Sequence, residues 1–224
     1  MATLVFDIAT AGKRWSQLDV LSRLALTKRT DVKTAEDQLG LSPLTGEVIS
    51  LGIYDVDRHQ GMVYVTGGEN GVAAYKVRKE KELLEDFWDG VRSYDVFVTF
   101  GGRRFDIPFV LHRSAVHRVA PSKEFRFGRS VEKQQMPYHV DLYDEFSRVG
   151  DFRMPLTLHL LAKAYGLESP DTEELRGETV GEFFRQKKFA DLAHYTEQNV
   201  RVTRELYGLW LEYFAPASFK NILV

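Results

Sequence analysis

One carboxylate near the start of the chain stands where chemistry could take place. Asp7 lies within residues 4–10 (LVFDIAT), whose apolar and β-branched side chains predict a strand. Because strand side chains alternate between faces, Asp7 and Ala9 are expected on one face and Ile8 on the other. A carboxylate among apolar neighbours is costly unless a positive charge compensates it. A divalent metal with oxygen ligands would do so. A buried aspartate that caps a turn is the alternative, and this stretch leaves both open.

Three later segments carry further polar groups with regular spacing. They are TFGGRRFD at 99–106, HVDL at 139–142 and YTEQNV at 195–200. The first follows a predicted buried strand at 95–100, and the second lies in a short strand predicted at 138–144. Tyr195 and Asn199 are four residues apart in a helix predicted at 189–213, so they share a face that could look back at the Asp7 strand.

The remaining pattern predicts an α/β protein with a mixed sheet. Strands are expected at 47–56, 62–66 and 72–77, forming an antiparallel meander with the first strand, and helices at 79–94, 111–119, 154–166 and 178–187. Strand and helix alternate after residue 79, which indicates that the sheet is mixed. Residues 13–46 read as a helix and a polar loop inserted before the second strand, either a lid or a surface excursion.

Composition sets the limits of the functional interpretation. The 224 residues carry a formal net charge of −2, so any basic surface must be local. There are no cysteines, which excludes disulfides, zinc–thiolate sites and cysteine nucleophiles and is compatible with a cytoplasmic location. We expect no signal peptide and no membrane span from the apolar runs. Residues 112–138 are locally basic with interleaved aromatics, typical of a nucleic-acid surface or, alternatively, of a solvated loop.

The order of these segments resembles the DEDD exonucleases of the RNase H-like superfamily. It looks most like the branch with a tyrosine in its third motif, related to the exonuclease domain of family B DNA polymerases, and residues 44–52 (LTGEVISLG) resemble that group's second strand. The resemblance implies one RNase H-like domain over residues 1–224, with an insertion at 13–46. Its sheet would have five or six strands flanked by helices. The implied activity is hydrolysis of nucleic acid from the 3′ end.

The resemblance also implies roles for individual residues. The family uses two Mg²⁺ or Mn²⁺ ions; Asp7 would bridge both, Asp106 would act on the second, and Tyr195 would orient the attacking water. Asp141 would be a support residue. The substrate would be single-stranded nucleic acid, DNA rather than RNA. Its contacts would come from Thr10, Arg103, Arg104 and Phe105, with further phosphate contacts from residues 112–138.

Two positions depart from the family pattern. The family has Glu where this chain has Ala9 and Asp where it has Asn199, and both belong to the first metal, which should therefore bind weakly. Glu197 is a poor substitute because it points about 200° away around the helix. The departures fit substitutions that inactivate an enzyme, or a natural relative that binds nucleic acid or a partner without catalysis. The first reading, an impaired exonuclease, is preferred.

Overall fold

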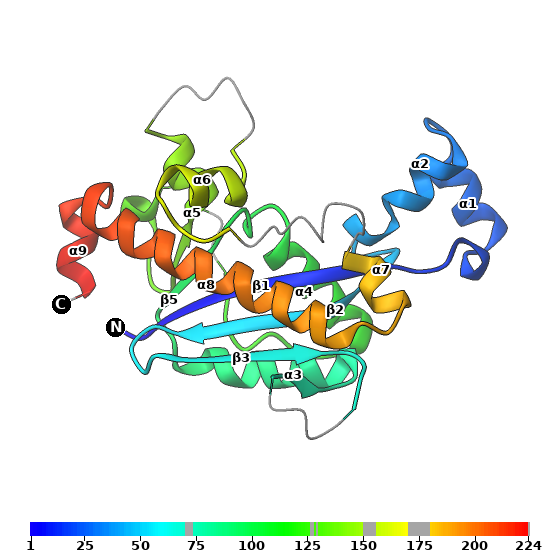
Figure 1. Cartoon of the computed structure of the whole chain (residues 1–224), viewed down its shortest axis with the longest axis horizontal. Helices are drawn as coiled ribbons and strands as arrows, with labels where there is room; N and C mark the ends of the chain where they lie inside the picture. The colour runs from blue at the N-terminus through cyan, green and yellow to red at the C-terminus, as the bar shows by residue number, and fades with distance from the viewer. Residues whose placement is uncertain (70–73, 126–127, 129, 150–155, 170–179, 224) are drawn as a thin grey trace.

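A six-stranded mixed sheet forms the centre of the described chain in the computed structural model. All residues are described except 70–73, 126–127, 129, 150–155, 170–179 and 224. The strand order is β4-β3-β2-β1-β5-β6 (Figure 1). The strands are β1 (Thr3–Gly12), β2 (Gly46–Asp55), β3 (Gln60–Val65), β4 (Lys76–Val77), β5 (Val96–Thr99) and β6 (Tyr138–Asp141). β2 pairs antiparallel with both β1 and β3. β4 pairs parallel with β3 at one edge, and on the other side β5 pairs parallel with β1 and β6 with β5, so the predicted α/β class with a mixed sheet is confirmed.

Helices cover both faces of this sheet. They are α1 (Val20–Leu26), α2 (Val32–Asp37), α3 (Glu80–Gly90), α4 (Asp106–His117), α5 (Leu142–Ser147), α6 (Leu158–Ala164), α7 (Val180–Arg185), α8 (Phe189–Tyr213) and α9 (Ala217–Leu223). α8 crosses one face of the sheet, α3 and α4 lie behind it, and α1 and α2 project as an arm from the end of β1 (Figure 1). The described residues contain no helix long and apolar enough to cross a bilayer.

The alternation of β1 side chains decides which layer each residue joins. Leu4, Phe6 and Ile8 pack into the cluster that includes α3 and α4, while Val5 packs with the apolar side of α8. Asp7 lies two residues after Val5 in the same strand, so its side chain is on the same face and points toward α8. β2 contributes Gly52 opposite Asp7. A Cβ at position 52 would lie 2.7 Å from a Val200 methyl carbon, so the absence of a side chain lets α8 lie close against the sheet.

Several predicted boundaries hold and others need correction. The predicted helix at 189–213 coincides with α8. The strand predicted at 138–144 ends at Asp141, because the Asp141 carboxylate accepts the Tyr143 N–H and caps α5. The helix predicted at 111–119 already begins at Asp106.

Other differences concern the meander and the insertion. Of the strand predicted at 72–77, only Lys76–Val77 forms, and it pairs parallel to β3; residues 72–73 lie outside the described chain. The insertion at 13–46 contains two short helices, α1 and α2, where one helix and a loop were predicted. The starts of the helices predicted at 154–166 and 178–187 also lie outside the described residues, whose helices there are α6 and α7.

Candidate functional site

Two aspartates from different elements stand together beneath α8. Asp7 comes from the middle of β1, and Asp106 is the first residue of α4. The Asp106 Oδ1 accepts the Ile8 N–H at 3.0 Å, which fastens the start of α4 to β1. Burial raises the pKa of Asp7 to about 7. Burial, followed by the nearby charge of Asp7, raises the pKa of Asp106 well above its usual range. The pair is therefore costly to ionise fully without a positive partner.

Asn199 supplies the polar partner of this pair. Its Nδ2 donates a hydrogen bond to the Asp7 Oδ2 at 3.1 Å, and its side chain is buried on α8. This contact lowers the pKa of Asp7 in part, against the larger effect of burial. The structure thus brings Asp7, Asp106 and Asn199 together, from three elements that are far apart in the sequence.

Ala9 and Tyr195 occupy different surroundings. Ala9 belongs to a buried apolar cluster with Phe183 and Ala193, so its methyl group faces apolar side chains. Tyr195 lies one turn before Asn199 and lines a cleft together with Ile8 and Thr10. Glu197, which the helix geometry places on another side of α8, lines a separate pocket.

The side chains at this site do not fit a centre for two divalent metals. Position 9 offers a methyl group, and position 199 turns its amide nitrogen, a donor, toward Asp7. Hard cations such as Mg²⁺ and Mn²⁺ require several oxygen ligands, of which carboxylates bind most strongly. Within the part of the chain that the structure describes, no three acidic, histidine or cysteine side chains form a group that could hold a metal. The Asp7–Asp106 pair alone is a short donor set for two ions.

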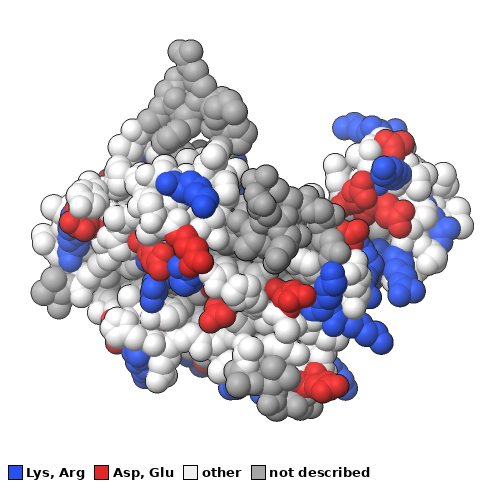
Figure 2. All heavy atoms as spheres, viewed as in Figure 1, with Lys and Arg blue, Asp and Glu red and all other residues white. Residues whose placement is uncertain are grey.

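A cleft of about 830 Å³ opens beside the aspartate pair, between the end of β1, the insertion and α7. Three exposed cations line it, Lys13, Arg14 and Arg185, together with the acids Glu36, Asp37 and Glu182. Phe105 and Tyr195 add aromatic surface to its wall. Figure 2 shows Lys and Arg atoms gathered on this flank, below the projecting arm and beside α7. The cleft combines cationic side chains with aromatic rings, a combination suited to single strands.

The four predicted substrate residues have different settings. Thr10 donates its hydroxyl hydrogen to the Gly40 carbonyl oxygen at 2.7 Å, which ties the insertion to β1. Phe105 is half-buried in the cleft wall. Arg104 is exposed, with its guanidinium 5.8 Å from the centre of the Tyr143 ring.

Arg103 is turned into the protein. Its Nε donates to the Asp144 Oδ2 at 2.7 Å and its Nη1 to the Gly128 carbonyl oxygen at 2.8 Å, and it is 8% exposed. Burial and this ion pair leave it badly placed to contact phosphates, so the predicted substrate role of Arg103 has no support in the structure.

Asp141 holds the loop that leads to Asp106. Its two carboxylate oxygens accept the N–H groups of Gly101 and Arg103, each at 2.8 Å. Gly101 has a φ of 77°, which glycine adopts without strain. The carboxylate therefore fixes the turn between β5 and α4, the position in which a support residue would act.

The basic segment at 112–138 is not a continuous nucleic-acid surface. Arg113 is buried and donates to both carboxylate oxygens of Glu80, at 2.8 and 2.6 Å. Phe125 packs in the core, with its ring centre 4.8 Å from that of Phe97. Lys123 donates to the Tyr94 carbonyl oxygen. The prediction of nucleic-acid contacts is wrong for Arg113 and Phe125; residues 126, 127 and 129 lie outside the described chain.

The cations of the cleft are not among the site residues predicted from the sequence. Lys13 and Arg14 directly follow β1, and Arg185 ends α7, about 170 positions later. The reading of residues 13–46 as a lid was the one signal that pointed to this region, because a lid must lie beside the site that it covers.

Comparison with known proteins now places the chain. Residues 48–217 match a family described as "Predicted 3'-5' exonuclease related to the exonuclease domain of PolB". The chain belongs to this family. The match runs from within β2 through α8 and includes Asp106 and Asn199, while β1 with Asp7 precedes it.

Two DNA polymerases illustrate the relationship. DNA polymerase 1 of Sulfurisphaera ohwakuensis is 31% identical over 70 residues, which is 31% of this chain and 8% of that protein. The family B DNA polymerase of the hyperthermophilic archaeon Pyrobaculum calidifontis has a similar fold, with a TM-score of 0.60 at 20% identity. The similarity covers 94% of this chain and 24% of that polymerase, so this chain corresponds to about a quarter of the polymerase's length.

Proposed function

We propose that this chain is a member of the exonuclease family that binds the 3′ end of single-stranded nucleic acid and whose capacity for hydrolysis is strongly impaired. The observation that carries the proposal is the Asn199 amide, which donates to the Asp7 carboxylate where the family has a second acid. Ala9, which packs among apolar side chains, stands where the family has another acid. The chain has the fold of the family and a cleft beside the aspartate pair, while it has fewer acids that would hold metal.

Strand binding rests on the cleft beside the aspartate pair. Lys13, Arg14 and Arg185 would contact phosphates, which positions a strand without reading its sequence. Phe105 and Tyr195 would stack with bases, an interaction of about 1–3 kcal/mol per base. Because the relatives are DNA polymerases by name, DNA is the preferred substrate over RNA.

Impairment follows from the electrostatics of the pair. Changing a residue that only supports a metal ligand typically costs about 10–100-fold in affinity or activity. Loss of two acids that would contact the metal directly should cost considerably more. We assign no two-metal hydrolysis to this chain, and the amide hydrogen bond of Asn199 partly offsets the charge of Asp7 without an ion.

The binding experiment is a fluorescence anisotropy titration with a short single strand of DNA that carries a 5′ label and a free 3′ hydroxyl. We expect binding that is unchanged by EDTA and that weakens as salt rises, since phosphate contacts release counterions. Lys13→Gln with Arg185→Gln should reduce both the affinity and its salt dependence. Arg92→Gln, which removes an exposed arginine outside the cleft, is the matched control.

A nuclease assay completes the test. Strands with a 3′ or 5′ label should remain intact with the unmodified chain in Mg²⁺ or Mn²⁺, and chelator serves as the control. Rapid release of mononucleotides from the 3′ end would show that hydrolysis by this chain is not impaired. Absence of any strand binding would instead favour a role in binding a protein partner.

A further inference from the structure

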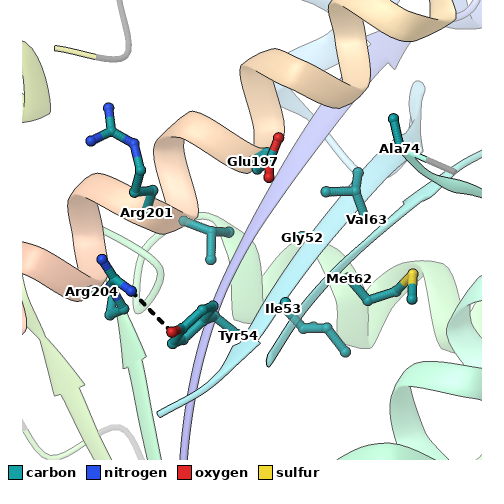
Figure 3. Close-up of a pocket in the computed structure, with 11 residues that line it drawn as sticks. Gly52, Ile53, Tyr54, Met62, Val63, Ala74, Glu197, Arg201 and Arg204 are labelled. Atoms are coloured by element: carbon teal, nitrogen blue, oxygen red, sulfur yellow. Dashed lines mark hydrogen bonds between the residues drawn. The ribbon is translucent and has the colours of Figure 1, made fainter. Parts of the chain in front are cut away.

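A second pocket, of about 470 Å³, lies between α8 and the β2–β3 hairpin (Figure 3). It is on the side of α8 that faces away from Asn199. Glu197, Arg201 and Arg204 line it from α8, while Tyr54 and Val63 line it from the strands (Figure 3). Its volume falls in the range of small-molecule sites, which are concave and mostly apolar with a few placed polar groups.

Glycines on the two strands make room for this pocket. Gly52 faces Val63 across the β2–β3 ladder, and Gly61 faces Tyr54, so all four positions share the face that α8 covers. Gly52 allows α8 to approach at one end. At Gly61 a Cβ would meet the edge of the Tyr54 ring at 3.2 Å, so the absence of a side chain there makes room for that ring in the pocket wall.

The polar groups lie in a defined order along α8. At one end, the Arg204 guanidinium lies 4.8 Å from the centre of the Tyr54 ring and its Nη1 donates to the Tyr54 hydroxyl at 2.9 Å. Arg201 stands three residues earlier on the same side of the helix (Figure 3). Both arginines contact the Glu205 carboxylate only loosely, at 3.3 and 3.4 Å. Arg201 also donates its Nε hydrogen to the Gln198 Oε1 at 2.8 Å and pairs with Glu168 at 3.0 Å.

Arg204 has donors to spare for a ligand. A guanidinium has five N–H donors in a planar fork, and its described partners, Tyr54 and Glu205, take one each. A phosphate is one of the anions that such a fork binds through two parallel hydrogen bonds. Glu197 lies further along the pocket toward Ala74 (Figure 3), and its carboxylate can only accept hydrogen bonds.

We propose that this pocket binds a nucleotide whose base carries an exocyclic amino group. The phosphate contacts Arg204 and Arg201, the base lies against Val63 and Val200, and Glu197 accepts the amino N–H. A carboxylate accepts from the N4 amino group of cytosine but faces an acceptor at the O4 of thymine, so dCMP binds and dTMP binds less well. This inference goes beyond the proposed function, because the site lies across α8 from the cleft and does not depend on strand binding there.

The probe is a methyl resonance of Val63, since this valine lines the pocket on the face of the sheet that α8 covers. Titration of the full chain with dCMP should shift that resonance, with an affinity about fivefold or more above that for dTMP. Arg204→Gln should weaken dCMP binding by about tenfold or more, since a charge-assisted contact is lost. Glu197→Gln should abolish the preference for dCMP over dTMP.

Two further variants keep the result decisive. Gly61→Val adds a side chain against the Tyr54 ring in the pocket wall without changing a charge and should also block dCMP, and an unchanged thermal melt shows that it folds. Arg185→Gln in the cleft should leave the dCMP titration unchanged. A short oligodeoxycytidine that shifts the same methyl group would identify a unit of a strand as the natural ligand, and a shift with dCMP alone would identify a free mononucleotide. The proposal is overturned if dCMP causes no Val63 shift, or if Arg204→Gln and Gly61→Val bind dCMP as well as the unmodified chain does.

Discussion

Restoring the two family acids tests how the aspartate pair is held. In Asn199→Asp, the Nδ2 donor to Asp7 is lost and a third carboxyl enters a site where burial already raises the pKa of Asp7 to about 7. A hydrogen bond to a charged group contributes about 1.5–3 kcal/mol, so unfolding should become easier by about 2–3 kcal/mol. For a chain of this size, the melting temperature should fall by roughly 4–12 °C.

Combined with Ala9→Glu, this change should create a metal-binding site, so that metal ions stabilise the folded chain. A ligand present at about 100 times its dissociation constant stabilises the folded state by about 2.7 kcal/mol. Mn²⁺ or Mg²⁺ should therefore raise the melting temperature of the double variant by roughly 5–10 °C, with no comparable rise for the parent. The double variant should also degrade single strands from the 3′ end in a metal-dependent manner.

The control is Asn221→Asp, which makes the same chemical change at an exposed position on α9. It should alter the melting temperature little and should not respond to Mn²⁺. The reasoning is refuted if the parent gains as much stability from Mn²⁺ as the double variant. If the double variant binds Mn²⁺ and single strands but cleaves nothing, the natural non-catalytic reading of the chain is favoured.

Three further outcomes follow from buried groups. Burial lowers the pKa of His139 to about 3, so below about pH 6.5 the unfolded chain binds a proton that the folded chain does not. The free energy of unfolding therefore decreases as the pH is lowered, by up to about 1.4 kcal/mol per pH unit. Urea midpoints of the parent should therefore drop more steeply from about pH 7 to pH 5 than those of His139→Gln. Arg113→Met should lower the free energy of unfolding in urea by about 3–5 kcal/mol, because it leaves the Glu80 carboxylate buried without its partner. Exchanging both residues for Met should recover much of this free energy, and the affinity for single strands should stay unchanged. Asp141→Asn should lower the melting temperature, because its amide group cannot accept both loop N–H groups, and hydrogen exchange should rise in the loop before Asp106.

The sequence by itself determined the parts of this protein that depend on local pattern. The apolar alternation of residues 4–10 specified β1 and the face of Asp7, and the helical period of residues 189–213 specified α8 with its ends. The order of the motifs identified the exonuclease family, and the alternation of strands and helices indicated the mixed sheet; both are confirmed. These features follow from short-range periodicity and from residues in a recognisable order, and both can be read along the chain.

Tertiary structure decided which charges meet. Nothing along the chain distinguishes Arg103 and Arg113, which are buried in ion pairs, from Lys13 and Arg185, which line the cleft. The partners Asp144 and Glu80 lie 41 and 33 residues away from these two arginines, and the two sides of the cleft come from opposite ends of the sequence. A charged side chain is paired or exposed according to the elements that pack around it, and that packing is set by the whole sheet. For the same reason, only the folded chain shows that the Asn199 amide reaches Asp7.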